Sequence, residues 1–253
     1  MRIAVAGGTG LVGAMVVEIA RAAGHEVVVL ARSRGVDLFR GTGLEEGVLS
    51  DVGAVIDVTN ATTMSARRSS SFFTAVSENL LAVGERAGVS HHLALSIVGV
   101  DRAPYGYYAG KRAQERLVER GPLPWTILRA TQFHEMAKIA YDTAHLGPLH
   151  LAPRMRVQPV GAREVAVQLL DLATRTPVDA VVEIAGPRRE SLNEMVKAYA
   201  RAVGSRSWTP AVSLPGALGR AQRDGTLLPQ GDVVLTEQTF AEWLESSTAA
   251  QGA

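Results

Sequence analysis

Short apolar runs alternate with longer amphipathic stretches along most of the chain. Continuous apolar runs bounded by polar turns are typical of strands buried on both faces, whereas apolar residues at helical spacing are typical of helices. The alternation therefore predicts an α/β fold with a doubly wound parallel sheet covered by helices on both sides. The expected strands are 3–6, 26–30, 36–39, 54–58, 92–98, 125–129 and 180–184. The expected helices are 11–23, 44–49, 72–87, 107–119, 133–144, 162–174, 191–203 and 240–244.

The alternation becomes less regular beyond residue 130. We expect one domain over residues 1–253, with a small C-terminal substrate lobe formed by about 131–160 and 186–253. Within this lobe, Ser191 and Glu194 have the spacing of a helix N-cap and its capping box. Residues 204–231 are rich in glycine and proline and are expected to be irregular, and 246–253 are expected to fray.

A glycine-rich sequence joins the first predicted strand to the first predicted helix. Gly7 allows a tight turn, Gly10 allows backbone N–H groups to approach a pyrophosphate, and Gly13 allows the helix to pack close to the strand. An anion at such a turn lies at a helix N-terminus, where unpaired N–H groups and the helix dipole favour it. The motif predicts a Rossmann-type fold that binds a dinucleotide through Gly7, Thr9, Gly10, Leu11, Val12 and Gly13.

The end of the second predicted strand indicates which dinucleotide is bound. An acidic residue at this position holds the ribose 2′-hydroxyl of NAD, whereas an arginine accommodates the 2′-phosphate of NADP. Here Arg32 stands at the strand end, followed by Ser33 and Arg34, and the first acidic residue is Asp37. Guanidinium groups bind phosphate through charge-assisted, often bidentate hydrogen bonds. The sequence therefore favours NADP (NADPH) over NAD, with contacts from Arg32 and Ser33.

A second group of residues carries possible chemistry. Tyr107 and Lys111 are four residues apart and share one face of a predicted helix, while Ser96 lies near the end of the preceding strand. A lysine cation beside a phenol lowers its pKa, so Tyr107 can exchange a proton with a substrate oxygen that Ser96 also contacts. The alternative is an ordinary amphipathic helix with a half-buried tyrosine and an exposed lysine. The nucleotide turn favours the catalytic interpretation.

Composition and charge narrow the class of protein. The 253 residues include 26 basic and 25 acidic ones, for a net charge of +1, which is not typical of proteins that bind nucleic acid or anionic membranes. The absence of cysteine excludes disulfides, thiolate metal sites and a cysteine nucleophile. The first strand follows Met1 directly, so we expect no signal peptide. We expect a cytoplasmic protein that acts on a small-molecule substrate; its oligomeric state stays open.

Several remaining polar residues are expected to be structural. Asp101 and Arg102 are expected to pair with each other or with solvent, and Arg68 to lie in a solvated loop, although it could flank the cofactor cleft. Trp243 is expected to pack the last helix, and His134 to be a surface histidine unless it touches substrate. No metal site is expected, because the following histidines lack carboxylates at ligand spacing: His91, His92, His134, His145 and His150.

With these motifs the chain resembles an atypical short-chain dehydrogenase/reductase of the NmrA-like, NAD(P)H-binding epimerase/dehydratase-like branch. The resemblance rests on residues 7–13, 95–99, 106–111 and 124–133. It implies that Tyr107 is the acid/base, that Lys111 binds the nicotinamide ribose and that Ser96 polarises a carbonyl. It also implies cofactor contacts from Thr59, Asn60, Ala61, Ala130, Thr131 and Gln132.

Two features depart from the pattern of this branch: the residue at one position, and the interval from Ser96 to Tyr107, which is short. Some members have an active-site asparagine on the helix after the fourth strand, where Phe73 stands here, and Asn79 is expected to be structural. The favoured function is an NADP(H)-dependent oxidoreductase that transfers hydride to or from a small organic carbonyl or alcohol. Two alternatives stay open: a non-catalytic NADP-binding sensor, and an epimerase or dehydratase on the same scaffold.

Overall fold

The computed structural model describes residues 1–249, apart from the side chain of Leu146. Seven strands form one sheet in the order β13-β10-β5-β4-β3-β1-β2, and the pairs β1–β2, β1–β3, β3–β4 and β10–β13 run parallel. Its strands are β1 (Arg2–Ala6), β2 (Glu26–Leu30), β3 (Val52–Asp57), β4 (His91–Ile97), β5 (Trp125–Ala130), β10 (Ala180–Ala185) and β13 (Val234–Leu235). The predicted α/β fold of the Rossmann type is thus confirmed.

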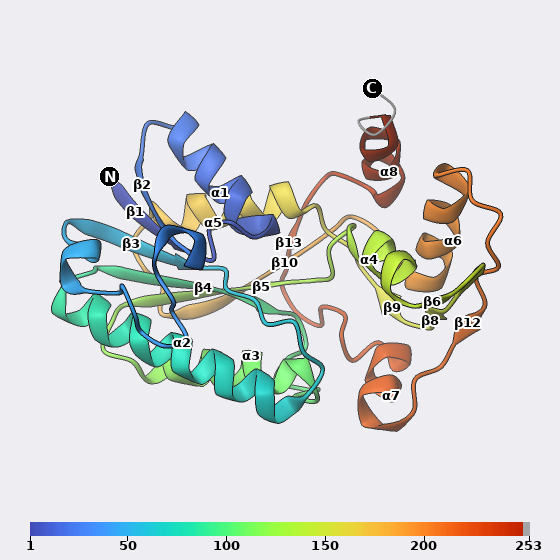
Figure 1. Ribbon diagram of the computed structural model, residues 1–253, viewed down its shortest axis with the longest axis horizontal. Coiled ribbons are helices and arrows are strands. Elements are labelled where there is room, and N and C mark those ends of the chain that lie inside the picture. The colour runs from blue at the N-terminus through green and yellow to red at the C-terminus, as the bar shows by residue number, and fades with distance from the viewer. Residues whose placement is uncertain (250–253) are drawn as a thin grey trace. The chain divides into compact units, whose positions relative to one another are not determined.

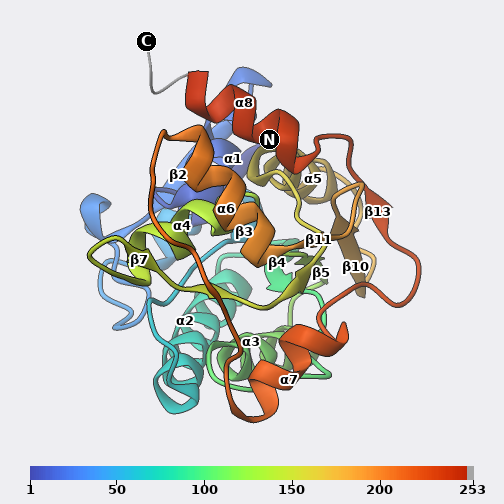
Figure 2. The same cartoon turned by 90° about the vertical axis from the view of Figure 1, so that its right-hand side faces the viewer.

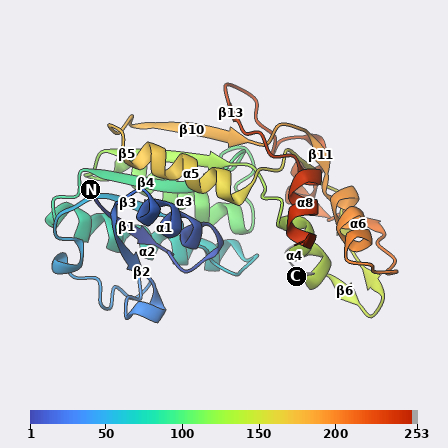
Figure 3. The same cartoon turned by 90° about the horizontal axis from the view of Figure 1, so that it is seen from above.

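Helices cover both faces of this sheet. Figures 1 and 3 show α1 (Leu11–Ala22) and α5 (Ala162–Ala173) on one face, and α2 (Ala66–Arg86) and α3 (Tyr107–Arg120) on the other. In α1 the buried residues Val12, Val16 and Ala20 recur every fourth position, so one stripe faces the sheet. The strands β1 and β3 are buried almost throughout, as expected for strands covered on both sides.

The chain divides into two compact units. The first consists of residues 1–129 and 163–182, and the second of 130–162 together with the chain from 183 onward. In the second unit α4 (Met136–Thr143) packs beside α6 (Leu192–Ala202), as Figure 2 shows. Its other elements are α7 (Gly216–Asp224), α8 (Phe240–Ala249), β6 (His145–Leu146), β7 (Leu149–His150), β8 (Ala152–Pro153), β9 (Arg156–Val157), β11 (Glu190–Ser191) and β12 (Ala211–Val212).

The predicted strand 36–39 is wrong. The segment forms turns with a single β-bridge between Asp37 and Thr42, and the Asp37 carboxylate accepts hydrogen bonds from the backbone N–H groups of Phe39 and Arg40. An aspartate that binds its own following backbone favours a turn over a strand. The segment 44–49 contains only a 3-10 turn, Glu46–Leu49, and Arg32–Arg34 forms another.

Other helix boundaries differ from the predicted ones. Helix α2 begins at Ala66 rather than 72, because the Ser65 hydroxyl caps it by accepting from the N–H of Arg68. Helix α7 lies within the stretch expected to be irregular, and α8 continues to Ala249. Ser191 precedes α6 without capping it, since its hydroxyl donates to Asn193 instead. The rest of the predicted frayed end, 250–253, lies outside the described residues.

Candidate functional site

The glycine-rich turn between β1 and α1 depends on close backbone contacts. Gly7 has a φ of +81°, and a Cβ there would lie 3.0 Å from the Val58 carbonyl oxygen. A Cβ at Gly13 would lie 2.2 Å from the Gly7 carbonyl oxygen, so only glycine permits this approach of helix to turn. No side chain caps the N-terminus of α1, and its first turn has no acidic residue. The helix end is therefore able to hold an anion.

A cleft of about 700 Å³ lies beside this turn, within the first unit. It brings together seven of the predicted cofactor residues: Gly7, Thr9, Gly10, Arg32, Thr59, Asn60 and Ala61. The other eight do not line it: Leu11, Val12, Gly13, Ser33, Lys111, Ala130, Thr131 and Gln132. Val12 and Gly13 are buried in the contact between α1 and the turn, which explains their place behind the cleft.

The lining of the cleft carries more positive than negative charge. Arg32, Arg40 and Arg68 line it, and Asp37 is the acidic residue among its lining. Arg40 is 4.0 Å from Asp37, whereas Arg32 and Arg68 form no ion pair within residues 1–249. Arg68 lies on α2 and not in a solvated loop, so the default expectation for it was wrong. The alternative that the sequence left open, that Arg68 flanks the cleft, agrees with its place in the lining.

Tyr107 is the first residue of α3 and reaches toward the loop that follows β3. Its hydroxyl donates to Asn60 Oδ1 over 2.7 Å, and its ring packs edge-on against Phe73, with centroids 5.7 Å apart. Burial raises the pKa of Tyr107, and Tyr108 and Asp57 raise it further. The expectation that Lys111 brings this pKa down was therefore wrong: burial, Tyr108 and Asp57 raise the pKa, and Lys111 is not among the groups that move it.

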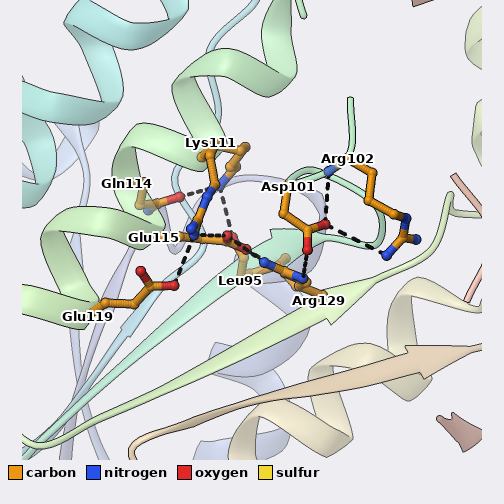
Figure 4. Close-up of polar contacts among 9 residues, drawn as sticks. Leu95, Asp101, Arg102, Lys111, Gln114, Glu115, Glu119 and Arg129 are labelled. Carbon is orange, nitrogen blue, oxygen red and sulfur yellow. Dashed lines mark hydrogen bonds and ion pairs between the residues drawn. The ribbon is translucent and has the colours of Figure 1, made fainter. Parts of the chain in front are cut away.

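Lys111 lies one turn further along α3 and is 4% exposed. Its ammonium donates to the carbonyl oxygens of Thr59 (3.2 Å) and Leu95 (2.9 Å) and to Gln114 Oε1 (3.0 Å), so all three of its protons are engaged. It also lies 4.3 Å from the centroid of the Phe73 ring. Burial lowers the pKa of Lys111 to about 8, and Asp57 and Glu115 oppose that change. Figure 4 shows the lysine directed inward from α3.

Asp57 completes a buried chain of polar contacts that was not predicted. One of its oxygens accepts from the Thr59 N–H (2.9 Å) and hydroxyl (2.7 Å), and the other accepts from Gln114 Nε2 (2.7 Å). The Gln114 amide thus joins the Asp57 carboxylate to the Lys111 ammonium. The one signal in the sequence was an aspartate at the end of an otherwise apolar strand.

A second buried network connects α3 to β5. Arg129 binds Glu115 through two parallel bonds of 2.7 and 2.8 Å, a geometry typical of strong arginine–carboxylate pairs. Arg112 donates to the same glutamate over 2.9 Å. Asp101 contacts Arg102 at 3.7 Å, as expected, and also Arg129 at 3.2 Å. Figure 4 shows Glu115, Arg129, Asp101 and Arg102 together, and these contacts tie α3 to β5.

Ser96, near the end of β4, is buried without a hydrogen-bond partner. It is 2% exposed, and its hydroxyl has no hydrogen-bond partner among residues 1–249.

The start of α3 is held against α2. The backbone carbonyl of Tyr107 accepts a hydrogen bond from the Ser69 hydroxyl on α2 over 2.7 Å. A Cβ at Gly110 would lie 2.2 Å from that hydroxyl oxygen, so α2 and α3 approach each other at a glycine. Asn79 donates to the Leu38 carbonyl, the structural role expected of it.

The remaining predicted residues belong to the second unit, where they are buried. The Thr131 hydroxyl donates to the Gln158 carbonyl over 2.6 Å, while the Gln132 side-chain amide is buried without a partner in the described chain. His134 is 0% exposed, so the surface expectation for it was wrong. Its ring packs against Trp243 at 5.9 Å and is 3.2 Å from the Gln238 carbonyl. Trp243 packs the last helix, as predicted.

The described residues lack two kinds of feature. None of their helices has both the length and the apolar character needed to span a membrane. Within the same residues, no three or more histidine, cysteine or carboxylate side chains converge as metal ligands.

Comparison with known proteins agrees with this geometry. A family model described as NAD(P)H-binding matches residues 7–171. Comparison with curated proteins gives no match. The chain is similar to the solved structure of a short-chain dehydrogenase/reductase superfamily protein from Agrobacterium tumefaciens with bound NAD, at 17% identity and a TM-score of 0.74, covering 100% of this chain and 97% of that one.

Two further solved structures carry other activities on the same fold. A UDP-glucose 4-epimerase from Thermotoga maritima is similar at 15% identity and a TM-score of 0.72, covering 100% of this chain and 99% of that one. An NADPH-dependent quinone oxidoreductase from Escherichia coli is similar at 16% identity and a TM-score of 0.62, covering 97% and 99%. At these identities the likeness establishes the fold, which is that of the short-chain dehydrogenases/reductases.

Proposed function

Because the chain belongs to this NAD(P)H-binding family, we propose that it is an NADP(H)-dependent oxidoreductase of the short-chain dehydrogenase/reductase type. Its substrate in this proposal is a small organic carbonyl or alcohol. One observation carries the proposal. The Tyr107 hydroxyl donates to Asn60 and the Lys111 ammonium donates to Thr59, and these two loop residues line the cleft beside the glycine turn. The proton donor Tyr107 and the cation of Lys111 thus both contact residues that line a cleft large enough for a nucleotide.

The residues of the cleft fit a dinucleotide. Because Gly7 and Gly13 have no side chain, the backbone of the turn can pack tightly and approach a pyrophosphate. The uncapped start of α1 supplies N–H groups for that pyrophosphate. Arg32 and Arg68 supply two guanidinium groups to the lining, which supports a preference for a 2′-phosphate. When bound, the nicotinamide supplies the hydride chemistry.

The side chains have distinct tasks in this proposal. Tyr107 has a raised pKa and therefore stays protonated at neutral pH, which suits a group that gives a proton to the oxygen of a carbonyl under reduction. It must exchange its bond to Asn60 for one to that oxygen. Ser96 has a buried hydroxyl with an unused proton, and it serves as a second donor to the same oxygen. Lys111 keeps a positive charge beside the loop.

The test is turnover by the purified protein. NADPH oxidation is followed with a panel of aldehydes, ketones and quinones, and Tyr107→Phe is expected to lower the rate at least about 100-fold, the scale of a lost acid catalyst. Tyr108→Phe is the matched control, because it removes the neighbouring phenol and keeps the acid. Unchanged turnover in Tyr107→Phe would contradict the assignment. Arg32→Ala is expected to weaken NADP binding while NAD binding changes little; equal losses for both would contradict the 2′-phosphate assignment.

A non-catalytic NADP-binding sensor is the second candidate. It is favoured by the state of Lys111, whose three protons are all engaged within the protein. Tight NADP binding with no turnover on the whole panel, together with unchanged cofactor affinity in Tyr107→Phe, would support the sensor. An epimerase or dehydratase would instead convert substrate with no net change in NADPH absorbance.

A further inference from the structure

The second unit contains a concave site of its own, of about 500 Å³. It is lined by four segments that lie apart in the sequence: 154–156, which leads into β9, the region where β11 meets α6, Ala211 of β12, and the end of α7. Four of its lining residues are cations and one is an anion: Arg154, Arg156, Lys197 and Arg223 against Glu194. A formal charge of +3 in one hollow contrasts with the +1 of the whole chain.

The cations differ in how far the protein already uses them. Lys197 is 2.9 Å from Glu194, and Arg223 donates to the Leu214 carbonyl over 2.8 Å. Arg154 and Arg156 are exposed, and neither has an ion-pair partner within residues 1–249. These two arginines therefore keep their hydrogen-bond donors for a ligand.

The backbone holds the two arginines in position. Between them, Met155 is 4% exposed, and its carbonyl accepts from the Leu192 N–H at the start of α6 over 2.9 Å. Arg156 also extends to the end of α7, because a Cβ at Gly225 would lie 3.4 Å from Arg156 Nη1. The cations of segment 154–156 and of α7 thus line one hollow.

We propose that this basic pocket, defined by Arg154, Arg156, Lys197 and Arg223, binds a small molecule through a multivalent phosphoryl group. Guanidinium groups pair with phosphate oxygens in a bidentate manner, and a net charge of +3 matches a diphosphate better than a single carboxylate. The site lies wholly within the second unit and is separate from the nucleotide cleft of the first. The proposal does not depend on whether the protein transfers hydride.

Calorimetric titration with inorganic pyrophosphate tests this proposal. The titration is run on the full-length protein with saturating NADP present, so that the nucleotide cleft is occupied. It is repeated in Arg32→Ala, which detects any pyrophosphate that binds in the cleft of the first unit instead. Arg154→Gln/Arg156→Gln is expected to weaken binding about tenfold for each arginine removed, as for the loss of a charge-assisted hydrogen bond. Arg188→Gln/Arg189→Gln is the matched control, because it removes two exposed arginines of the same unit that do not line the pocket.

The outcomes separate the possibilities. Loss of pyrophosphate affinity in Arg154→Gln/Arg156→Gln alone supports the proposal, and Arg156→Glu is then expected to abolish binding. Equal losses in both double variants would show a general field effect and would overturn it, as would a failure to bind or a loss confined to Arg32→Ala. Malonate that binds as tightly as pyrophosphate would overturn the phosphoryl assignment. NADP affinity is measured in each variant and, if unchanged, shows that the variants are folded.

Discussion

Replacing Asp57 with asparagine is expected to lower the pKa of Lys111. Asp57 acts through Gln114, whose amide oxygen is 3.0 Å from the ammonium and whose amide nitrogen is 2.7 Å from the carboxylate. The two charges are then about 7 Å apart, and at an effective dielectric constant of about 20 they attract by about 2.4 kcal/mol. Since about 1.4 kcal/mol corresponds to one pKa unit, loss of the carboxylate lowers the pKa of Lys111 by about 1 to 2.

Hydrogen bonding acts in the same direction. Asp57 accepts from Thr59 on one side and from Gln114 on the other, which directs the Gln114 oxygen toward Lys111. In Asp57→Asn one of the two carboxylate oxygens is replaced by an NH₂ group, which can only donate. In the series of contacts from residue 57 through Gln114 to Lys111, two hydrogen-bond donors then face each other at one position. The conflict disappears when Lys111 loses a proton and becomes an acceptor. Lys111 has a pKa of about 8 and is mostly charged at pH 7.5; in Asp57→Asn it becomes mostly neutral.

The measurement is carbon NMR of labelled lysine side chains during a pH titration. The chain has only Lys111, Lys138 and Lys197, so the signals are simple to assign by substitution. Lys138, whose pKa Asp142 raises, is the internal reference. Asp101→Asn is the matched control, because Asp101 is not among the groups that move the Lys111 pKa. A Lys111 pKa that stays near 8 in Asp57→Asn, or rises, would refute the reasoning.

Two further substitutions test the packing around the site. Gly13→Ala is expected to weaken NADP binding at least about tenfold and to destabilise the fold by about 1–3 kcal/mol, because its Cβ would lie 2.2 Å from the Gly7 carbonyl oxygen. Gly47→Ala, with open space around its Cβ, should leave binding and urea stability unchanged, and equal effects would argue against the steric reason. Glu115→Gln is expected to cost about 3–5 kcal/mol in urea unfolding, since it weakens the pairing of a buried guanidinium. Glu46→Gln, in an exposed pair, should cost about 0–1 kcal/mol, and a similar loss in both would contradict the role of burial.

The features that the sequence predicted well are those set by local rules. Gly7 and Gly13 are needed wherever backbone atoms approach this closely, so their spacing indicated the turn before the fold was known. Arg32 follows a strand whose apolar run was plain, and it lines the cleft. The catalytic and cofactor roles assigned to these residues stay predictions. The strand expected at 36–39 failed because a side chain, Asp37, captured the backbone locally.

The environment of Lys111 could not be predicted, because it depends on contacts across the fold. Helical spacing showed that Tyr107 and Lys111 share a face, but not that the lysine passes beneath Phe73 into the interior. Gln114 connects Lys111 to Asp57, and Asp57 is 57 residues away from Gln114 in the sequence. Such a partner becomes visible only when α3 is placed against β3 and β4. The direction of the Tyr107 pKa therefore also depended on burial that spacing does not report.

The three acceptors of Lys111 determine how it can take part in binding. To reach a group in the cleft, the ammonium must give up one acceptor, and the longest of its three bonds, 3.2 Å, goes to the carbonyl of Thr59, which lines the cleft. The bonds to Leu95 and Gln114 would then keep the lysine in place. Asp57 holds both Thr59 and Gln114, so a single carboxylate couples the loop at the cleft wall to the charge of the lysine. The loop and the lysine should therefore respond together to any change at Asp57, whether the protein is an enzyme or a sensor.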